Sequence, residues 1–319
     1  MEYTYLPFTP KAASRLVYGT GNNVVTASDT AAAWECLDMA WEAGFRIFDT
    51  AFSYGNAEKN LGSWLESRGH RDELILLDKG CNPGQNGSND IFCAETIRSQ
   101  LHMSLERLRT DHAEMYILHR DDPTRPVDEI VEVLNELKAE GRIHAFGGSN
   151  WSLSRLKEAN EYAAERHLEG FTVCSPHYAL TPLHTDPWGG SVSIAGESGK
   201  PYREYLKRTG LPVFNYSSLG RGYLSGKYTA FGNRPIGECL PWAPVAEYHC
   251  PENERILQRA QTLAAEKGCS VSQLCLSYLL SQGLNLFPIV GPTKEQHLTD
   301  NVQALRVKIS PEECRYLEG

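Results

Sequence analysis

The sequence predicts an α/β protein whose parallel strands close into a (β/α)8 TIM barrel with long loops on the active-site face. Segments rich in β-branched and aromatic residues alternate with segments of helical periodicity along the 319 residues, which is typical of a parallel sheet. Eight strands are expected, and eight parallel strands close as a barrel. Polar residues also stand at the carboxyl ends of successive predicted strands, where a barrel holds its active site. An open doubly wound sheet is the alternative.

The predicted elements follow one another without an internal repeat. The first long helix carries Trp34, Leu37 and Trp41 at helical spacing and stops at Gly44, and a later helix ends at Gly141. The predicted strands cover residues 16–19, 45–49, 73–78, 114–118, 143–147, 171–174, 212–216 and 286–290. The predicted helices cover about 28–43, 58–68, 92–109, 127–140, 152–166, 200–209, 252–267, 271–282 and 294–305.

We expect residues 1–319 to form one barrel domain. The connections 179–199 and 228–251 are too long for simple barrel turns. Both follow predicted strands, so we expect both on the active-site face, where long loops usually bind a ligand.

The composition narrows the class of function. The formal net charge is −9, which argues against nucleic acid or an anionic membrane as a partner. The nine cysteines are an odd number without C-x-x-C spacing, which favours free thiols in a reducing compartment. The first residues lack the basic and apolar segments of a signal peptide, and no apolar run could span a bilayer. A cytoplasmic location is therefore expected.

Four residues at or just after predicted strand ends suit one chemistry. Asp49, Tyr54, Lys79 and His119 stand in that order along the chain. Reducing a carbonyl requires a hydride and a proton, and a tyrosine with a pKa of about 10 is too weak an acid unless a nearby cation stabilises its phenolate. Lys79 can supply that charge, Asp49 can hold the lysine, and a histidine can bond the substrate oxygen.

Each of these residues alone also has an ordinary structural explanation. Asp49 could be a helix cap, Tyr54 a half-buried aromatic, Lys79 a solvated strand terminus and His119 a core histidine. The shared position at strand ends and the chemical fit favour the catalytic interpretation.

These residues also carry a family resemblance. The segment Asp49-Thr50-Ala51-x-x-Tyr54-Gly55 resembles the signature of the aldo-keto reductases, and Lys79 and His119 match the remaining two catalytic positions of that family. The resemblance extends over nearly the whole chain. It implies a (β/α)8 barrel that binds extended NADP(H) without a Rossmann domain and works by a metal-free, ordered reaction.

Three segments resemble the family's cofactor-binding regions. Residues 147–151 are similar to the segment that holds the nicotinamide carboxamide, residues 216–228 to the stacking tyrosine and the pyrophosphate loop, and residues 291–301 to the segment that reads the 2′-phosphate and adenine. The implied cofactor-binding residues are Thr20, Asp49, Ser149, Asn150, Ser175, Tyr216, Ser217, Leu219, Arg221, Lys227, Gly291, Thr293, Lys294, His297, Asp300 and Asn301.

The chemistry of these residues agrees with that assignment. Ser149 and Asn150 can bond a primary amide, and Tyr216 offers a ring face to the nicotinamide. The glycine-rich loop 220–226 can bring backbone N–H groups near phosphates, although it could equally be a surface turn and lacks G-x-G-x-x-G spacing. Lys294 stands where a helix begins, which favours phosphate. The acid and amide at 300–301 could bond adenine or be solvated helix residues.

The chain departs from the family pattern at three positions. Ser175 stands where many relatives have Gln, Ser218 replaces a frequent Pro, and His297 stands where relatives often have Arg or Gln. The last departure leaves NAD(H) open as a second cofactor beside NADP(H).

Aromatic residues on predicted active-site loops are the candidates for substrate contact: Phe52, Trp151, Trp188 and Trp242. They could stack on a sugar face or an apolar carbonyl compound, or pack on themselves as lids. The polar residues of 179–199 favour a sugar-like or polyol substrate.

Three functions compete. The first is an oxidoreductase that acts on a small aldehyde, ketone or alcohol with NADP(H). The second is a nicotinamide-binding redox sensor or regulatory subunit with weak catalysis. The third is a metal-dependent barrel isomerase or hydrolase, which would need a cluster of His, Asp and Glu at strand ends; the sequence shows only the tetrad there, so no metal is expected. The sequence does not predict the oligomeric state.

Overall fold

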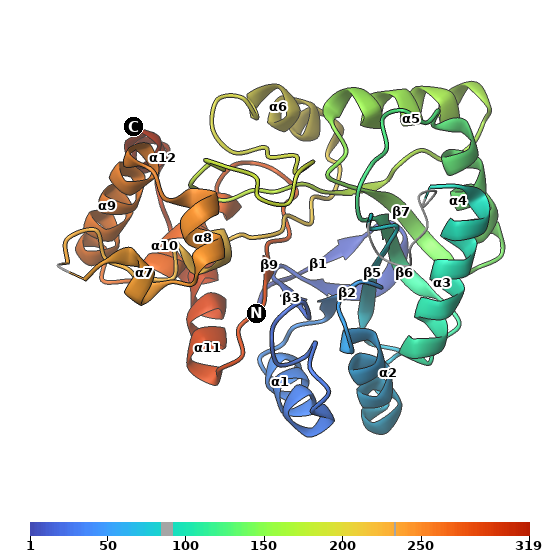
Figure 1. Ribbon diagram of the computed structural model, residues 1–319, viewed down its shortest axis with the longest axis horizontal. Coiled ribbons are helices and arrows are strands. Elements are labelled where there is room, and N and C mark those ends of the chain that lie inside the picture. The colour runs from blue at the N-terminus through green and yellow to red at the C-terminus, as the bar shows by residue number, and fades with distance from the viewer. Residues whose placement is uncertain (84–91, 233) are drawn as a thin grey trace. The chain divides into compact units, whose positions relative to one another are not determined.

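The computed structural model describes residues 1–83, 92–232 and 234–319 (Figure 1). The chain forms two compact units. Unit 1 comprises Met1–Ser175 and Gly291–Glu295, and unit 2 comprises Pro176–Val290 and Gln296–Gly319.

Unit 1 is built on a parallel sheet in which strands adjacent in sequence are also neighbours in space, in the order β8-β7-β6-β5-β4-β3. The residues of these strands are almost all buried, as expected for parallel strands covered by helices. The strands are β3 (Val17–Gly19), β4 (Ile47–Asp49), β5 (Ile75–Gly80), β6 (Ala113–Leu118), β7 (Ile143–Ser149) and β8 (Val173–Ser175).

The register of these strands places their carboxyl ends side by side. Asp49 pairs with Leu77, two residues before Lys79. Lys79 in turn pairs with Ile117, two residues before His119. The polar residues that follow the apolar strands therefore gather at one edge of the sheet, as the sequence predicts.

Helices alternate with the strands of unit 1 and lie beside them in Figure 1. Asp29 caps the first by accepting a hydrogen bond from Ala32 N at 3.1 Å, and Gly69 ends the second in a left-handed conformation. Helices α2 and α3 approach closely, because a Cβ atom on Gly62 would lie 2.3 Å from Arg107 O. The helices are α1 (Thr30–Glu42), α2 (Ala57–Arg68), α3 (Ala94–Leu108), α4 (Asp128–Ala139) and α5 (Leu153–Glu165).

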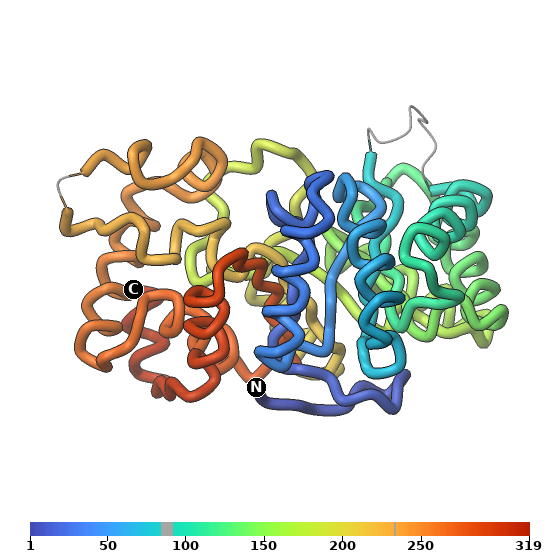
Figure 2. The backbone as a smooth tube through the Cα atoms, turned by 90° about the horizontal axis from the view of Figure 1, so that it is seen from below, coloured from blue at the N-terminus to red at the C-terminus, as the bar shows by residue number. Residues whose placement is uncertain are grey.

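A hairpin that the sequence did not predict opens the chain. Strands β1 (Tyr3–Leu6) and β2 (Thr9–Ser14) pair in antiparallel fashion, with an irregularity between Tyr5 and Leu6. Figure 2 shows this hairpin in dark blue crossing one end of the unit. Its Lys11 bonds Leu74 O at 2.8 Å, immediately before β5, so the hairpin covers the amino ends of the strands.

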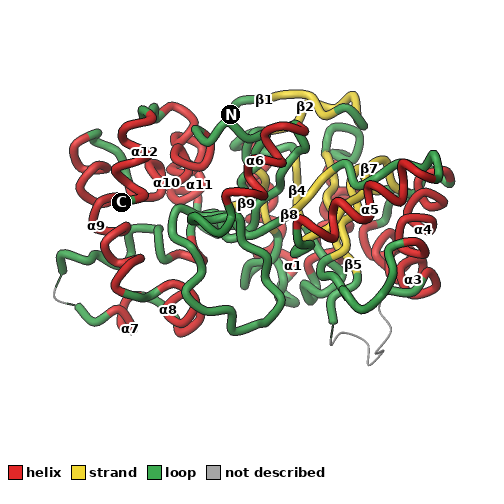
Figure 3. The backbone as a smooth tube through the Cα atoms, turned by 90° about the horizontal axis from the view of Figure 1, so that it is seen from above, coloured by secondary structure: helices red, strands yellow, loops and turns green. Residues whose placement is uncertain are grey.

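Unit 2 consists mainly of helices and long loops (Figure 3). Its short strand is β9 (Ile289–Val290). Its helices are α6 (Lys200–Thr209), α7 (Ile236–Cys239), α8 (Trp242–Tyr248), α9 (Pro251–Glu266), α10 (Val271–Leu280), most of α11 (Glu295–Gln303) and α12 (Pro311–Glu318). In the described part of the chain, no helix combines the length and the apolar character needed to cross a bilayer.

The predicted strand at 212–216 is the clearest correction. The segment forms only isolated bridges, from Val213 to Leu286 and from Tyr216 to His177. Pro212 lacks an N–H group, and the segment pairs with different partners at its two ends, so no continuous ladder forms. The sequence also missed α12 and the helices α7 and α8 inside the connection 228–251.

Candidate active site

A buried ion pair forms the base of the site in unit 1. The Lys79 ammonium contacts the Asp49 carboxylate, and both residues are almost fully buried. The ammonium also donates to Thr50 O at 3.2 Å. Burial acts to lower the pKa of Lys79, but Asp49 and Tyr54 raise it, and the net pKa lies above the ordinary value. Lys79 therefore keeps its positive charge.

Tyr54 lies next to this charge. Lys79 Nζ is 5.2 Å from the centre of the Tyr54 ring. The turn that carries the tyrosine is fixed by hydrogen bonds from Tyr54 N to Ala51 O and from Ala57 N to Tyr54 O, both 2.9 Å. A Cβ atom on Gly21 would lie 2.9 Å from the ring, so the absence of a side chain there lets the ring approach the backbone.

His119 meets the Tyr54 ring edge-on, with ring centres 5.7 Å apart and planes at 80°. Burial lowers the pKa of His119 well below its usual range, and the charges of Lys79 and Arg120 lower it further. The imidazole is therefore neutral. Its Nδ1 atom has no hydrogen-bond partner among the described residues. The structure thus brings all four residues of the predicted tetrad together.

Three predicted cofactor residues adjoin the tetrad in unit 1. Ser149 Oγ donates to Ser175 O at 2.8 Å, and Asn150 Nδ2 donates to Ser149 Oγ and to His119 O, both at 3.2 Å. Asn150 has a φ of 62°, which is uncommon for a residue other than glycine and often marks a functional site. The Ser175 hydroxyl is buried, and no described residue bonds it. An unpaired buried hydroxyl beside two polar side chains fits a primary amide.

The other predicted cofactor residues of unit 1 have different surroundings. Thr20 is buried and its hydroxyl donates to Asp49 O at 2.9 Å, so it supports the end of β4. Gly291 approaches β3 so closely that a Cβ atom would lie 3.0 Å from Gly19 O. Thr293 is half-buried, and Lys294 is exposed just before α11.

In unit 2, the predicted stacking residue Tyr216 packs against His177, with ring centres 5.6 Å apart. His177 is bonded on both nitrogens, Nδ1 to Ser193 Oγ at 2.8 Å and Nε2 to Tyr248 OH at 2.9 Å. Burial, with a contribution from Arg221, lowers the pKa of His177 to about 3. A neutral, doubly bonded histidine therefore supports Tyr216, a role that the sequence did not suggest.

The pyrophosphate-loop candidates also lie in unit 2. Ser217 and Arg221 have φ angles of 53° and 50°, so both adopt the left-handed conformation that few non-glycine residues take. Leu219 accepts a hydrogen bond from Gly222 N at 3.0 Å, and Lys227 is exposed.

Glu247 joins two of the predicted site residues in unit 2. It is 3% exposed, and its carboxylate accepts hydrogen bonds from Trp188 Nε1 at 2.6 Å and pairs with Arg221 Nε at 3.0 Å. Trp188 in turn packs on Trp242, with ring centres 5.7 Å apart. The two tryptophans are 52% and 64% exposed. The two long connections thus contribute one exposed aromatic pair, which we call the tryptophan pair, and a buried acid orients it.

Most of the remaining candidate residues for substrate or cofactor contact are buried or already bonded to other residues. Phe52 is buried under the Arg107 guanidinium, 4.2 Å from the ring centre, and Trp151 is buried and donates to Arg120 O at 3.0 Å. Asp300 accepts hydrogen bonds from Ser270 and Gln273, both at 2.8 Å, which ties α11 to α10. His297 is exposed, and Asn301 is buried. Their assigned roles stay predictions.

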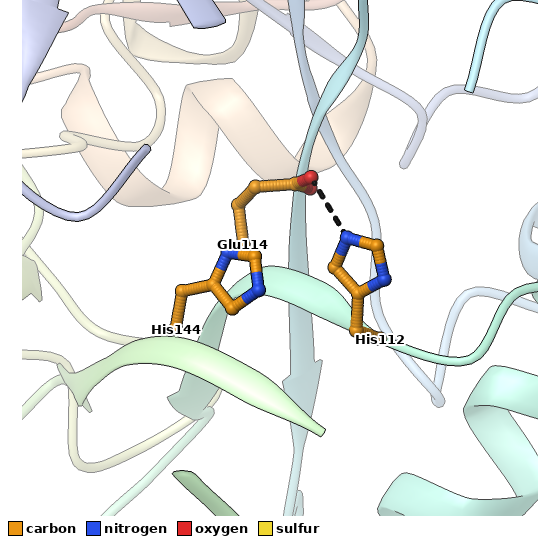
Figure 4. A group of neighbouring side chains, drawn as sticks. All are labelled: His112, Glu114 and His144. Atoms are coloured by element: carbon orange, nitrogen blue, oxygen red, sulfur yellow. Dashed lines mark ion pairs between the residues drawn. The ribbon is translucent and has the colours of Figure 1, made fainter. Parts of the chain in front are cut away.

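Figure 4 shows a group that the sequence interpretation overlooked: His112, Glu114 and His144, whose potential metal-ligand atoms all lie within 4.8 Å of one another. The signal was a His-x-Glu pair at the start of β6 and a histidine at the start of β7. Glu114 Oε1 already accepts hydrogen bonds from Lys11 Nζ at 2.6 Å and from Arg71 Nη1 at 2.9 Å. Because two positively charged side chains thus pair with the carboxylate, we interpret the group as a structural ion cluster.

The protonation of this cluster supports that interpretation. Burial alone would raise the pKa of Glu114, but His112, Arg71 and Lys11 together hold it far below its usual range. The Glu114 carboxylate raises the pKa of His112. The cluster lies at the amino ends of the strands, the face of a barrel that serves stability rather than chemistry.

Comparison with known proteins identifies the family to which this α/β fold belongs. The model of the Aldo/keto reductase family matches residues 15–319, so the chain belongs to this family. Members of the family fold as (β/α)8 barrels and act on carbonyls or alcohols with nicotinamide cofactors, generally NADP(H). The protein is accordingly an enzyme with the predicted barrel fold, an oxidoreductase of small-molecule carbonyls or alcohols.

Curated relatives cover most of the chain. Uncharacterized oxidoreductase YrpG of Bacillus subtilis (strain 168) is 30% identical, with 99% of this chain and 95% of the relative covered. Probable aryl-alcohol dehydrogenase AAD4 of Saccharomyces cerevisiae is 26% identical, with 90% and 87% covered. Norsolorinic acid reductase A of Aspergillus parasiticus is 26% identical, with 97% and 77% covered.

Proposed function

We propose that this enzyme reduces an aldehyde or ketone, or oxidises the corresponding alcohol, with Tyr54 as its general acid and base. One arrangement carries the proposal. A charged, buried Lys79 lies beside the Tyr54 ring, and a neutral His119 meets the same ring from another side. We propose in addition that residues 1–319 act as one barrel domain.

Each side chain has a defined part in the reaction. When bound, NADPH supplies the hydride that reduces the carbonyl carbon. Tyr54 gives its hydroxyl proton to the carbonyl oxygen, and the Lys79 charge stabilises the phenolate that remains. Asp49 holds Lys79 in place, since a buried ammonium needs a counter-charge. His119 is neutral, so one ring nitrogen can donate a hydrogen bond that orients the carbonyl oxygen. In alcohol oxidation the phenolate takes the proton back.

We assign the cofactor as NADP(H), with NAD(H) as a possible second cofactor. Ser149, Asn150 and Ser175 would hold the nicotinamide carboxamide, a role supported by the unpaired Ser175 hydroxyl. The stacking role of Tyr216 is supported by the rigid histidine behind it. Lys294, exposed at the start of α11, would pair with the 2′-phosphate. The other cofactor-binding positions keep the roles that the family resemblance gives them.

For the substrate, the tryptophan pair supports a compound with a flat ring. Exposed indoles with fixed orientation are suited to stacking. The name of one relative, an aryl-alcohol dehydrogenase, is consistent with an aromatic aldehyde or alcohol. A sugar-like or polyol substrate remains the alternative, since indoles also stack on sugar faces.

The test is NADPH oxidation by the purified protein with two matched panels, aryl aldehydes and sugar aldehydes. We expect turnover with the wild-type protein and with Tyr5→Phe, an exposed tyrosine that is 78% accessible. Tyr54→Phe should bind NADPH and fail to turn over. NADPH binding without turnover of either panel by the wild-type protein would contradict the proposed carbonyl reduction.

A further inference from the structure

A second group of buried acids lies between the sheet and the helices of unit 1, apart from the ions of the tetrad. Asp78 on β5 is fully buried, and Glu58 on α2 is 1% exposed. Asp78 pairs in register with Tyr116 on β6, so their side chains lie on the same face of the sheet. Gln100 and Ser104, four residues apart on α3, are also buried.

Together these five residues hold six buried polar atoms that make no hydrogen bond of ordinary distance and angle with a described residue, although Ser104 and the Lys79 backbone lie close enough to Asp78 to lower its pKa. The atoms are Glu58 Oε1, Asp78 Oδ1 and Oδ2, Gln100 Nε2, Ser104 Oγ and Tyr116 OH. Buried polar atoms without partners are costly, and several of them in one layer indicate ordered water or an ion.

The electrostatic surroundings leave one surplus negative charge if both acids are ionised. Arg107 on α3 pairs with Glu58 Oε2 at 2.9 Å, and Lys79, on the same strand as Asp78, is paired with Asp49. Burial raises the pKa of Asp78 well above its usual range, and Glu58 raises it further, while the Lys79 backbone, the Lys79 charge and Ser104 oppose this by less. Of the other titratable groups nearby, Tyr116 and Cys81 both have raised pKa values because they are buried, so they remain neutral.

The mixture of atoms decides what kind of ligand fits. Asp78 and Glu58 need donors, whereas Gln100 Nε2 needs an acceptor and the two hydroxyls can serve as either. A metal cation would satisfy the oxygens but would meet the amide N–H groups of Gln100 and the nearby Arg107 charge. Water both donates and accepts, and buried water typically makes about three hydrogen bonds to such groups.

We infer that Glu58, Asp78, Gln100, Ser104 and Tyr116, here called the Asp78 cluster, form an internal water-binding site built around the buried Asp78 carboxyl group. No described residue forms an ion pair with Asp78, so we place Asp78 as the neutral acid and Asp49, which contacts the Lys79 ammonium, as the carboxylate. The close approach of Tyr116 to the strand supports a built site, because a Cβ atom on Gly80 would lie 1.9 Å from Tyr116 OH.

The first test measures the protonation of Asp78 in the folded protein. Infrared spectra of the wild-type protein at neutral pH should show the carbonyl stretch of a protonated carboxylic acid. The band should shift in D2O and disappear in Asp78→Asn, and it should persist in Asp72→Asn, an exposed aspartate just before the same strand. A crystal structure should show water within hydrogen-bond distance of Asp78. Absence of the band, or a bound metal ion among these residues, would overturn the inference.

The second test is the pH dependence of unfolding. A carboxyl whose pKa is raised on folding binds more protons in the folded state, so stability falls as pH rises from about 4, the unfolded value, to the folded pKa. The wild-type folding constant should therefore fall relative to that of Asp78→Asn, by up to about tenfold per pH unit in this window. Asp72→Asn should follow the wild type. Parallel curves for the wild type and Asp78→Asn would show that Asp78 is ionised.

Discussion

Lys79 Nζ lies 5.2 Å from the centre of the Tyr54 ring, while its own counter-ion is the buried Asp49 carboxylate. The pair therefore places one positive charge beside the phenol in surroundings from which water is largely excluded, and there a charge acts strongly. The ion pair that holds Lys79 in the fold therefore also positions the charge on which the proposed acid chemistry of Tyr54 depends.

Replacing Lys79 with methionine should damage both properties. Lys79→Met removes the charge that stabilises the phenolate, so carbonyl reduction should fall by about 10²–10⁴. It also leaves Asp49 buried without a partner, which should cost about 3–5 kcal/mol in the free energy of unfolding. Steady-state kinetics and urea unfolding measure the two effects, with Lys59→Met on the exposed face of α2 as the control. Wild-type turnover by Lys79→Met would remove the lysine from the mechanism.

The ion cluster at the opposite ends of the strands should affect stability alone. Glu114→Gln leaves Lys11 and Arg71 facing a neutral amide and should cost about 3–5 kcal/mol at neutral pH. The folded pKa of Glu114 is depressed, so its contribution is present above the unfolded pKa of about 4.3 and is lost as the pH falls below that value. The loss caused by the substitution should therefore shrink in acid.

Urea unfolding at several pH values checks this prediction. The control is Glu66→Gln, because the exposed Glu66 pairs with exposed Arg109 and such pairs contribute at most about 1 kcal/mol. An equal and pH-independent loss in both variants would contradict the role assigned to Glu114. A gain in stability on adding Zn²⁺ to the wild type would instead favour a metal site.

Removal of Trp188 should weaken ring-shaped substrates selectively. The indole is held by Glu247 and packs on Trp242, so its loss removes one face of the tryptophan pair. We expect Trp188→Ala to raise KM for an aryl aldehyde by about tenfold, equivalent to a ring contact of about 1–1.5 kcal/mol. Phe231→Ala is the control, because Phe231 has the same exposed fraction as Trp242, 64%. Equal KM values for Trp188→Ala and the wild type would exclude this contact.

Cofactor choice should depend on Lys294. A hydrogen bond from an ammonium to a phosphate contributes about 1.5–3 kcal/mol, so Lys294→Ala should weaken NADPH binding by about 10–150-fold and leave NADH binding nearly unchanged. Quenching of tryptophan fluorescence gives both dissociation constants. Lys308→Ala, an exposed lysine beyond α11, is the control. An unchanged ratio of the two constants would transfer the discrimination to Arg221, Lys227 or backbone groups.

The fold class and the proximity of the four tetrad residues were predictable because both depend on local patterns. Buried strands end in polar residues, and parallel register alone brings Asp49, Lys79 and His119 to one edge. The strand positions indicated where the site lies, and the signature around Tyr54 then indicated the protein family.

The missing parts depend on contacts between residues far apart in the chain. His177 is bonded by Tyr248, 71 residues away, and Glu247 joins Trp188, 59 residues away. No periodic pattern in the sequence indicates such pairs. The hairpin β1–β2 was not predicted because its short strands are irregularly buried. Asp78 was not singled out because it lies in an apolar strand next to Lys79.

The most direct test of the proposed mechanism is single-turnover NADPH oxidation by Tyr54→Phe, with an aldehyde that the wild type reduces. The substitution removes one oxygen and leaves the Asp49–Lys79 pair in place, so NADPH should bind with nearly unchanged affinity. The rate of the chemical step should fall by about 10²–10⁴, the usual contribution of a general acid. A single-turnover rate equal to that of the wild type would show that Tyr54 is not the proton donor.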